Sequence, residues 1–406
     1  MSQTTLERSA ASAGAAPYLR DALSGRVGEF IALRRDIHQH PELGFAEHRT
    51  AALVAQRLCD WGYTVHTGIG GTGVVGTLKR GSGSKSIGLR ADMDALPIDE
   101  ADGRAWKSRH AGVMHACGHD GHTATLLAAA REIAEQAQFD GTLHLIFQPA
   151  EEGGGGALRM MEDGLFERHP CDAVFALHNA PGLPEGMLAF RAGATMASSD
   201  YVSITVRGQG GHGALPHRAS DPVVAAASIV MALQTVVSRN VDPLHSAVVT
   251  VGAIHGGQAN NVIPQDVRLE LSVRALDAQV RATLRQRIHE IAQLQAQSYG
   301  AQATIDWRDG YCVLVNDAGQ TAFAADVATR LFGQARVMRE APPITASEDF
   351  AFMLERVPGC YFFIGNGVEG APGGCMVHNP NYDFNDALIE PGAAMWLALV
   401  EEFLGT

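Results

Sequence analysis

The chain has 406 residues, of which 46% are hydrophobic and 18% charged, and its formal net charge at pH 7 is -13. This composition is typical of a globular protein of about two or three domains, without the basic runs that bind nucleic acid or membrane surfaces. The first 17 residues are polar and rich in Ala and Ser, unlike a signal peptide, and no stretch approaches the ~20 apolar residues of a membrane span.

Cysteines are scattered along the chain. There are 6 of them, and none forms a C-x-x-C pair. For a long chain without a signal peptide, this usage is typical of free thiols in a reducing compartment. We therefore expect a cytoplasmic protein.

Predicted helices and short apolar strands alternate in the first part of the chain. Helical spacing of apolar residues predicts helices over 18–33, 47–61 and 123–138, and buried-type strands are expected over 87–90, 143–147 and 173–177. A first strand is also expected to begin at 63–66. Such alternation predicts an α/β domain with a mixed, mostly parallel sheet flanked by helices.

Each of the three buried-type strands runs directly into polar groups. The first leads to Asp92 and Asp94, the second to Glu151 and Glu152, and the third to His178. In open α/β sheets, ligands bind beyond the carboxyl ends of the strands. We therefore expect these side chains to share one site.

The pattern changes after residue 192. Strands are expected over 201–207, 248–255, 267–275 and 303–307, and helices begin after the capping residues Asp221 and Asp277. The order β-α-β-β-α-β is that of a ferredoxin-like unit. We predict an inserted ferredoxin-like α+β domain over 194–308, between two parts of a catalytic domain over 1–193 and 309–406.

The α/β pattern resumes in the last part of the chain. Helices are expected over 320–332 and 391–403, a helix start over 345–350, and a buried strand over 360–364. A Gly-rich loop, 365–374, follows that strand and leads to His378.

Residues 115–122 hold the densest group of potential ligands. Cys117 and His119 are two residues apart, so in an extended segment they point to the same side, and Gly118 and Gly121 would let the loop turn tightly around an ion. For a lone Cys-x-His pair, a buried cysteine with capping histidines would be the better explanation. The metal interpretation depends on Glu152, His178 and His378, which follow strands elsewhere.

Cysteine, histidine and carboxylate donors together suit zinc and similar divalent ions. Five donors exceed the needs of one tetrahedral ion, and with one shared donor they could hold two, as in sites that clamp a carbonyl and a nucleophilic water. Glu151 is adjacent to Glu152 and would point the other way in an extended chain, so one carboxylate could bind metal while the other acts as general base. Asp92 or Asp94 could orient a ligand histidine.

Several motifs together carry a family resemblance. They lie at 34–42, 89–97, 115–122, 148–153, 211–217, 260–264, 347–350 and 378–380. With them the chain resembles the dinuclear metal hydrolases that include aminoacylases and zinc carboxypeptidases. Within that group it is similar to the amidohydrolase subfamily of hippurate hydrolases, N-acyl-amino-acid deacylases and indole-acetyl-amino-acid hydrolases.

The resemblance implies a role for each site residue. It implies Cys117, His119, Glu152, His178 and His378 as ligands of two divalent ions (Zn, Mn, Co or Ni), with Glu151 as general base and proton shuttle. It implies that His212, on the inserted dimerisation domain, stabilises the oxyanion in the other subunit of a homodimer or larger oligomer. Asn261 and Arg274 would bind substrate, and the guanidinium of Arg274 suits a carboxylate.

The expected activity is hydrolysis of the amide bond of small N-acyl amino acids, with no nucleic-acid or membrane partner. A dipeptidase or carboxypeptidase with the same site is an alternative. Peptidases of the wider group commonly have His-x-Asp where this chain has Asp92-Met93-Asp94, so their metal identity and bridging ligand do not transfer to this chain. A cysteine hydrolase with Cys117 as nucleophile and His119 or His178 as base is another. The third is a metal-binding or dimerising protein without catalysis.

Overall fold

The computed structural model describes residues 25–405, which form two compact units. Unit 1 contains the described residues up to Gly193, together with Asn316–Pro342 and the chain from Phe352 onward. Unit 2 contains Ala194–Val315 and Pro343–Ala351.

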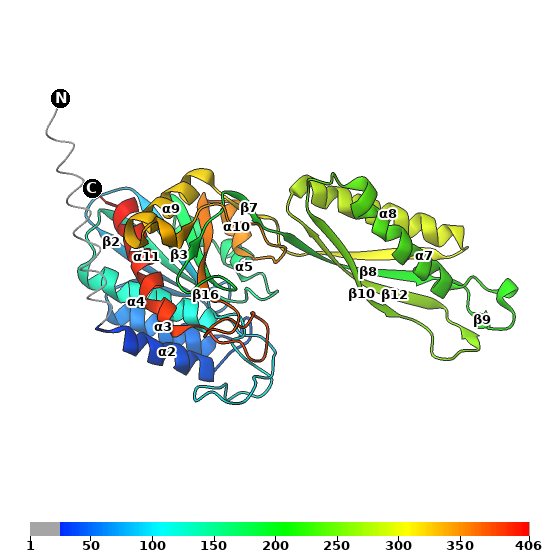
Figure 1. Ribbon diagram of the computed structural model, residues 1–406, viewed down its shortest axis with the longest axis horizontal. Helices are drawn as coiled ribbons and strands as arrows, with labels where there is room; N and C mark the ends of the chain where they lie inside the picture. Colours follow the sequence, from blue (N-terminus) through cyan, green and yellow to red (C-terminus); the bar gives the residue numbers. More distant parts are fainter. Residues whose placement is uncertain (1–24, 406) are drawn as a thin grey trace, which may run out of the picture. The chain divides into compact units, whose positions relative to one another are not determined.

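Unit 1 is built on an eight-stranded sheet of order β1-β2-β4-β3-β5-β16-β6-β15 (Figure 1). The strands are β1 (Thr64–Ile69), β2 (Gly73–Arg80), β3 (Ser86–Asp92), β4 (Gly141–Gln148), β5 (Ala173–Pro181), β6 (Leu188–Ala189), β15 (Val337–Met338) and β16 (Gly359–Gly367). The central strands β4, β3, β5 and β16 are parallel, whereas β1 and β2 form an antiparallel hairpin that pairs with β4. The mixed, mostly parallel sheet expected from the sequence is confirmed.

Helices cover the sheet of unit 1. They are α2 (Val27–Gln39), α3 (His48–Asp60), α4 (His119–Gln136), α5 (Gly156–Glu162), α6 (Leu165–Arg168), α9 (Ala318–Phe332) and α11 (Ile389–Phe403); α10 (Phe350–Leu354) is a short helix shortly before β16. Helix α4 packs against α2, α11 and the sheet, which explains why it is buried almost all round. The first expected helix begins at Val27 in the described part, and its residues 18–24 lie outside that part.

Unit 2 has the element order β8-α7-β10-β12-α8-β13. These are β8 (Ser198–Arg207), α7 (Pro222–Thr235), β10 (Ala247–His255), β12 (Asp266–Ala275), α8 (Ala278–Ser298) and β13 (Gln302–Asp309), with the sheet order β10-β12-β8-β13. Both expected caps are present, because Asp221 accepts from Val223 N and Asp277 accepts from Val280 N. Apolar side chains of α7 and α8 form one core with those of the sheet.

Two further features of unit 2 concern its surface. A small hairpin joins β9 (Gly211–His212) to β11 (Val262–Ile263). Helix α7 continues as a π-helical turn to Asn240, and Pro222–Asn240 is long and apolar enough to cross a membrane by length and composition, with 33% of its most apolar window buried. Its buried residues, such as Ile229 and Leu233, belong to the core of unit 2, which is typical of a packed helix.

A hydrogen-bonded chain links His66 on β1, Thr77 on β2 and His144 on β4 with His169, which follows α6. His66 Nδ1 is 2.9 Å from His169 Nε2, His169 Nδ1 is 3.3 Å from Thr77 Oγ1, and that hydroxyl is 2.9 Å from His144 Nδ1. Burial, together with the adjacent His169, lowers the pKa of His144 to about 4. Burial and the neighbouring His66 also lower the pKa of His169 to about 4. Both rings are therefore neutral in the folded protein at neutral pH.

Because of these two histidines, the free energy of unfolding should decrease as the pH is lowered. Their stabilisation is present above the unfolded pKa of about 6.5 and is lost as pH falls through the folded value, because the unfolded chain takes up the protons first. The free energy of unfolding is measured by urea denaturation of the metal-free protein, with a chelator present. Between pH 7.5 and pH 5.0, it should fall by about 1–2 kcal/mol less in His144→Gln than in wild type. The exposed His48→Gln is the control, and equal pH dependence in all three proteins would contradict the prediction.

Candidate metal centre

The five predicted metal ligands come together at one edge of the unit 1 sheet. Cys117 precedes α4, His119 is its first residue, and His178 lies on β5. Glu152 follows β4, and His378 lies in the loop after β16.

The donors form two overlapping groups. One ligand atom from each of Cys117, His119 and His178 lies within 4.8 Å of the other two, and the same holds for Cys117, Glu152 and His378. Cys117 Sγ lies 3.4 Å from His178 Nε2, and Glu152 Oε1 lies 3.1 Å from His378 Nε2. Cys117 is the residue common to both groups, so it is positioned to serve two ions.

Cys117 and His119 do not lie on the extended segment that the sequence predicted. His119 begins α4, and Gly118 between the two donors has φ 94°, so they are not on one extended segment. A Cβ on Gly118 would lie 2.3 Å from Asn179 Oδ1 and 2.4 Å from the Tyr382 hydroxyl. Only glycine fits there, both by its backbone angle and by the space available.

Gly121 has a different role from the one expected. It lies inside α4 rather than in a loop, and a Cβ at this position would approach the Phe384 ring to 2.3 Å. It therefore permits close packing of the helix against the segment that follows His378.

A strained turn carries the two glutamates. Ala150, two residues after β4, has φ 49°, and its N–H donates to Glu47 Oε1 at 2.8 Å. A Cβ on Gly156 would lie 1.7 Å from the Pro149 carbonyl oxygen, so the turn requires glycine there. Positive φ at a non-glycine residue is uncommon, and His378 has it too, at 62°. The strain is located next to the general-base candidate and at one metal ligand.

Glu151 is buried beside the predicted ligands. Its side chain is 7% exposed, and one carboxylate oxygen forms a group within 4.8 Å with donor atoms of His119 and Glu152. This arrangement provides a carboxylate beside the donors, as a general base requires.

Asp94 holds two ligands at once. Its Oδ1 lies 3.2 Å from His119 Nδ1, and its Oδ2 accepts a hydrogen bond from the backbone N–H of Glu152 at 2.9 Å. The carboxylate thus fixes the ring with Nε2 available for a metal, as in many histidine sites.

Asp92 supports the histidines from behind. Its Oδ1 is 2.6 Å from His122 Nδ1, and its Oδ2 accepts from Arg90 at 2.6 Å. The other nitrogen of His122 is 2.7 Å from Asn179 Oδ1, and its ring centroid is 4.5 Å from that of His178. His122 therefore orients its neighbours.

The electrostatics of the donor set fit a bound cation. Burial and the Glu152 carboxylate raise the pKa of the Cys117 thiol well above its usual range. Burial disfavours charge on His119, but the carboxylates, Asp92 foremost, outweigh it and raise its pKa to about 10. His119 Nε2 is buried and has no hydrogen-bond partner among the described residues. A divalent cation would provide that partner and stabilise the thiolate.

The other residues of the 115–122 stretch are structural. Asp120 Oδ2 lies 2.9 Å from His38 Nδ1, whose other nitrogen is 3.2 Å from Glu100 Oε1. Burial lowers the pKa of His115 to about 4. His38 is thus a buried brace rather than a ligand.

Three predicted residues lie in unit 2. His212 is exposed on β9, and Asn261 lies next to β11, with its carbonyl accepting from Gly213 N at 2.8 Å. His212 Nδ1 accepts from the backbone N–H of Ala214 at 3.0 Å, which leaves the proton on Nε2 as a donor. Arg274, on β12, is half-buried and donates to Ser347 Oγ at 2.9 Å.

Sequence reasoning missed most of the supporting residues. Asn179 donates to the Tyr382 hydroxyl at 2.7 Å behind the donors, and Arg34 binds Asp120 at 3.3 Å. Arg34 stands in the motif at 34–42, and an arginine on the buried side of a predicted helix was the available signal.

Comparisons with known proteins find related hydrolases. Residues 88–402 match the peptidase family M20/M25/M40. A hippurate hydrolase from Campylobacter jejuni is 46% identical over 377 residues, covering 93% of this chain and 97% of that protein. An N-acetyl-L-cysteine deacetylase from Bacillus subtilis is 40% identical, covering 90% and 86%, and a thermostable carboxypeptidase 2 from Saccharolobus solfataricus is 36% identical, covering 92% and 95%.

A solved structure of a related protein matches the fold of this chain. The crystal structure of a dinuclear metal-binding peptidase of the M20 family from Bacillus subtilis is 30% identical, with a TM-score of 0.81. The match covers 94% of this chain and 99% of that chain. Divalent metal binding by this chain follows from the family and from the donor groups.

Asp94→Asn should weaken metal binding while leaving the fold intact. The amide must turn its NH₂ group toward one of two donors, His119 Nδ1 or Glu152 N, so one ligand loses its support. We expect metal affinity to fall by about 10- to 100-fold, measured by competition with a chromogenic chelator. Asp99→Asn, at an exposed aspartate, is the matched control. Wild-type affinity in Asp94→Asn would contradict the role given to this carboxylate.

Proposed function

We propose that this chain, which belongs to peptidase family M20/M25/M40, is a metal-dependent amidohydrolase that cleaves N-acyl amino acids to a carboxylic acid and a free amino acid. The observation that carries this proposal is the pair of donor groups that share Cys117, next to the buried carboxylate of Glu151. The named activities of the hippurate hydrolase and the deacetylase support this substrate class.

Two divalent ions would occupy the donor groups. His119 and His178 would hold one, Glu152 and His378 the other, and Cys117 would contact both. When bound, such ions polarise a carbonyl and lower the pKa of a water molecule. Imidazole, thiolate and carboxylate ligands suit zinc, and manganese, cobalt and nickel accept the same donors.

Glu151 would move the proton during hydrolysis. Its carboxylate takes a proton from the attacking water as the new C–O bond forms. It then delivers that proton to the amide nitrogen as the C–N bond breaks, so water is consumed and no net proton remains on the enzyme. A buried carboxylate within reach of the site is suited to both steps.

His212 would stabilise the negative charge that develops on the carbonyl oxygen. Its Nδ1 accepts from Ala214 N, so Nε2–H is the outward donor of an exposed ring. A preoriented donor of this kind is what an oxyanion requires. We propose, from the family resemblance, that the ring serves the site of a second subunit.

Arg274 and Asn261 would bind the substrate. The half-buried guanidinium of Arg274 is held by Ser347 and so presents its remaining N–H groups in a fixed direction. A guanidinium matches the carboxylate that every N-acyl amino acid carries. Asn261, beside His212 on the β9–β11 hairpin, would contact the amide.

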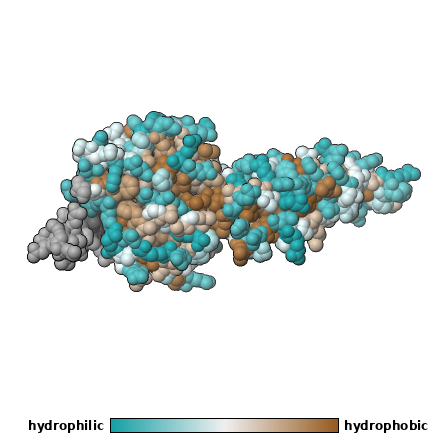
Figure 2. Space-filling view, turned by 90° about the horizontal axis from the view of Figure 1, so that it is seen from above, coloured by the Kyte–Doolittle hydropathy of each residue, from teal (hydrophilic) through white to brown (hydrophobic). Residues whose placement is uncertain are grey.

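We infer that unit 2 contains a ferredoxin-like dimerisation domain over 194–308. Its element order and its sheet order β10-β12-β8-β13 support this reading. Strand β10 is an edge strand, and Ile254 on it is 57% exposed; helix α7 beside it exposes Val224 and, to 72%, Met231. Figure 2 shows apolar patches on the surface of this unit. An edge strand with exposed apolar residues fits pairing with a second copy.

We infer a cytoplasmic location from the cysteines. All 6 are free thiols, and Cys117 and Cys360 are buried. A site that requires a free thiol as metal ligand is suited to a reducing compartment.

Two alternatives are weaker on specific grounds. A peptidase would use the same site, and the name of the carboxypeptidase relative supports this alternative. That relative is 36% identical to this chain, whereas the hippurate hydrolase is 46% identical. A cysteine nucleophile requires a thiolate, whereas burial and Glu152 raise the pKa of Cys117. The rates of hydrolysis of benzoyl-, acetyl- and indole-acetyl-amino acids, compared with those of dipeptides, distinguish an amidohydrolase from a peptidase.

Glu151→Gln should retain metal and lose turnover. The amide keeps the size of the side chain but cannot accept the proton of water, so kcat should fall by about 10²- to 10⁴-fold. Glu152→Gln is the matched variant, and it should lose metal as well as activity. Metal content and hippurate hydrolysis are the two measurements. Near-wild-type kcat in Glu151→Gln would overturn the assignment.

Mixing two inactive variants should restore activity if His212 acts in the partner subunit. A heterodimer of Glu151→Gln and His212→Ala contains one intact site, because the intact Glu151 and the intact His212 come from different chains. Random exchange makes half of the dimers mixed, so we expect about a quarter of wild-type specific activity. Each variant alone is the control. Absence of complementation, with heterodimers verified by mass spectrometry, would exclude a shared site.

A further inference from the structure

Arg34 joins the two chain segments that carry three of the metal ligands. This side chain, on α2, is fully buried, with 0% exposed. It reaches Asp120, which follows His119, and it also reaches Asp383 and Asp386, which follow His378 in the chain.

The contacts use different edges of the guanidinium. NH1 donates to Asp120 Oδ2 at 3.3 Å and to Asp383 Oδ1 at 3.0 Å, and Nε donates to Asp386 Oδ1 at 2.8 Å. A planar group with five donors can hold three carboxylates in fixed relative positions, which a single ammonium cannot do.

The segment after His378 has little regular structure of its own. Between β16 and the 3₁₀ turn at Asp386–Leu388 it forms turns and bends only, and the His378 side chain is 51% exposed. Its placement therefore depends on contacts such as His378 N–H to the Ala116 carbonyl at 2.7 Å and those of Asp383 and Asp386.

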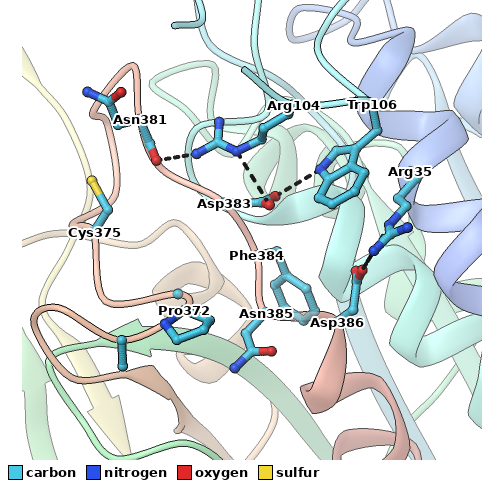
Figure 3. A pocket seen from close by; sticks show the side chains of 12 residues that line it. Arg35, Arg104, Trp106, Pro372, Cys375, Asn381, Asp383, Phe384, Asn385 and Asp386 are labelled. Atoms are coloured by element: carbon cyan, nitrogen blue, oxygen red, sulfur yellow. Dashed lines mark hydrogen bonds and ion pairs between the residues drawn. The ribbon is translucent and has the colours of Figure 1, made fainter. Parts of the chain in front are cut away.

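Asp383 and Asp386 also line a pocket of about 490 Å³, where other side chains bind them. Figure 3 shows Asp383 between Arg104 and Trp106, and Asp386 bound to Arg35. Arg35 neighbours Arg34 on α2 and stacks over Trp106, with its guanidinium carbon 3.7 Å from the ring centroid. Arg35 forms its ion pair with Asp386, after His378, and not with Asp120. Unlike Arg34, Arg35 therefore does not connect the two segments that carry the ligands.

We propose that Arg34 is a positioning residue that fixes His378 relative to Cys117 and His119, and thereby sets the affinity for the ion bound by Cys117, Glu152 and His378. The inference rests on the proposed two-ion site and extends it to a residue that contacts neither metal nor substrate. The ion bound by His119 and His178 depends less on Arg34, because those ligands lie on regular elements, α4 and β5.

Arg34→Lys tests this assignment, with Arg35→Lys as the matched control. Each variant keeps its positive charge and loses only the geometry of the guanidinium. The chelated protein is titrated with Co²⁺, and binding is followed by the visible absorption of the ion and its thiolate charge-transfer band. In Arg34→Lys we expect one ion bound as in wild type and the second at least about tenfold more weakly. Arg35→Lys should bind both ions as wild type does.

The outcomes separate this inference from the proposed function. Wild-type protein that binds fewer than two ions would overturn the two-ion site itself. Two ions bound with wild-type affinity by folded Arg34→Lys would overturn the role of Arg34 alone. If Arg34→Lys does not fold, Asp383→Asn decides, because it neutralises the partly exposed carboxylate that Arg34, Arg104 and Trp106 contact. If Asp383→Asn binds the second Co²⁺ ion with wild-type affinity, the proposal is rejected as well.

Discussion

The burial of ionisable groups around Cys117 is the constraint on which the rest of the structure depends. Thiol, imidazole and carboxylate donors lie within 4.8 Å of one another in each of two groups, and Cys117 and His119 among them are buried. Without a cation, burial and Glu152 keep the thiol protonated, and His119 Nε2 has no partner among the described residues. Divalent ions would offset these costs, so metal binding and the architecture of unit 1 are coupled.

The fold meets this constraint by collecting donors from different strands and bracing each one. Parallel strands β3, β4, β5 and β16 direct their carboxyl ends to one edge of the sheet. Asp94 and Asp92 then orient histidines through hydrogen bonds, and Arg34 ties the irregular segment after His378 to the start of α4. Backbone strain at Ala150 and His378 is tolerated because the surrounding contacts hold both residues.

The sequence predicted the mixed sheet, most elements of both units and the donor residues that come together at the candidate metal centre, because strands followed by polar groups form a local pattern. It could not predict the backbone at Gly118, since its φ depends on contacts with Asn179 and Tyr382 that come from distant parts of the chain. The roles of Arg34 and Gly121 were hidden for the same reason, because their partners, such as Phe384 and Asp386, are hundreds of residues away. The roles of His212 and Arg274 came from family resemblance, and they remain predictions.

The most direct test of the central claim, that Cys117 is shared between two ions, is a crystal structure of the zinc-loaded protein with anomalous diffraction data collected at the zinc edge. We expect two anomalous peaks per chain, both within bonding distance of Cys117 Sγ, one also contacting His119 and His178 and the other Glu152 and His378. A single peak, or two peaks of which only one contacts the sulfur, would contradict it.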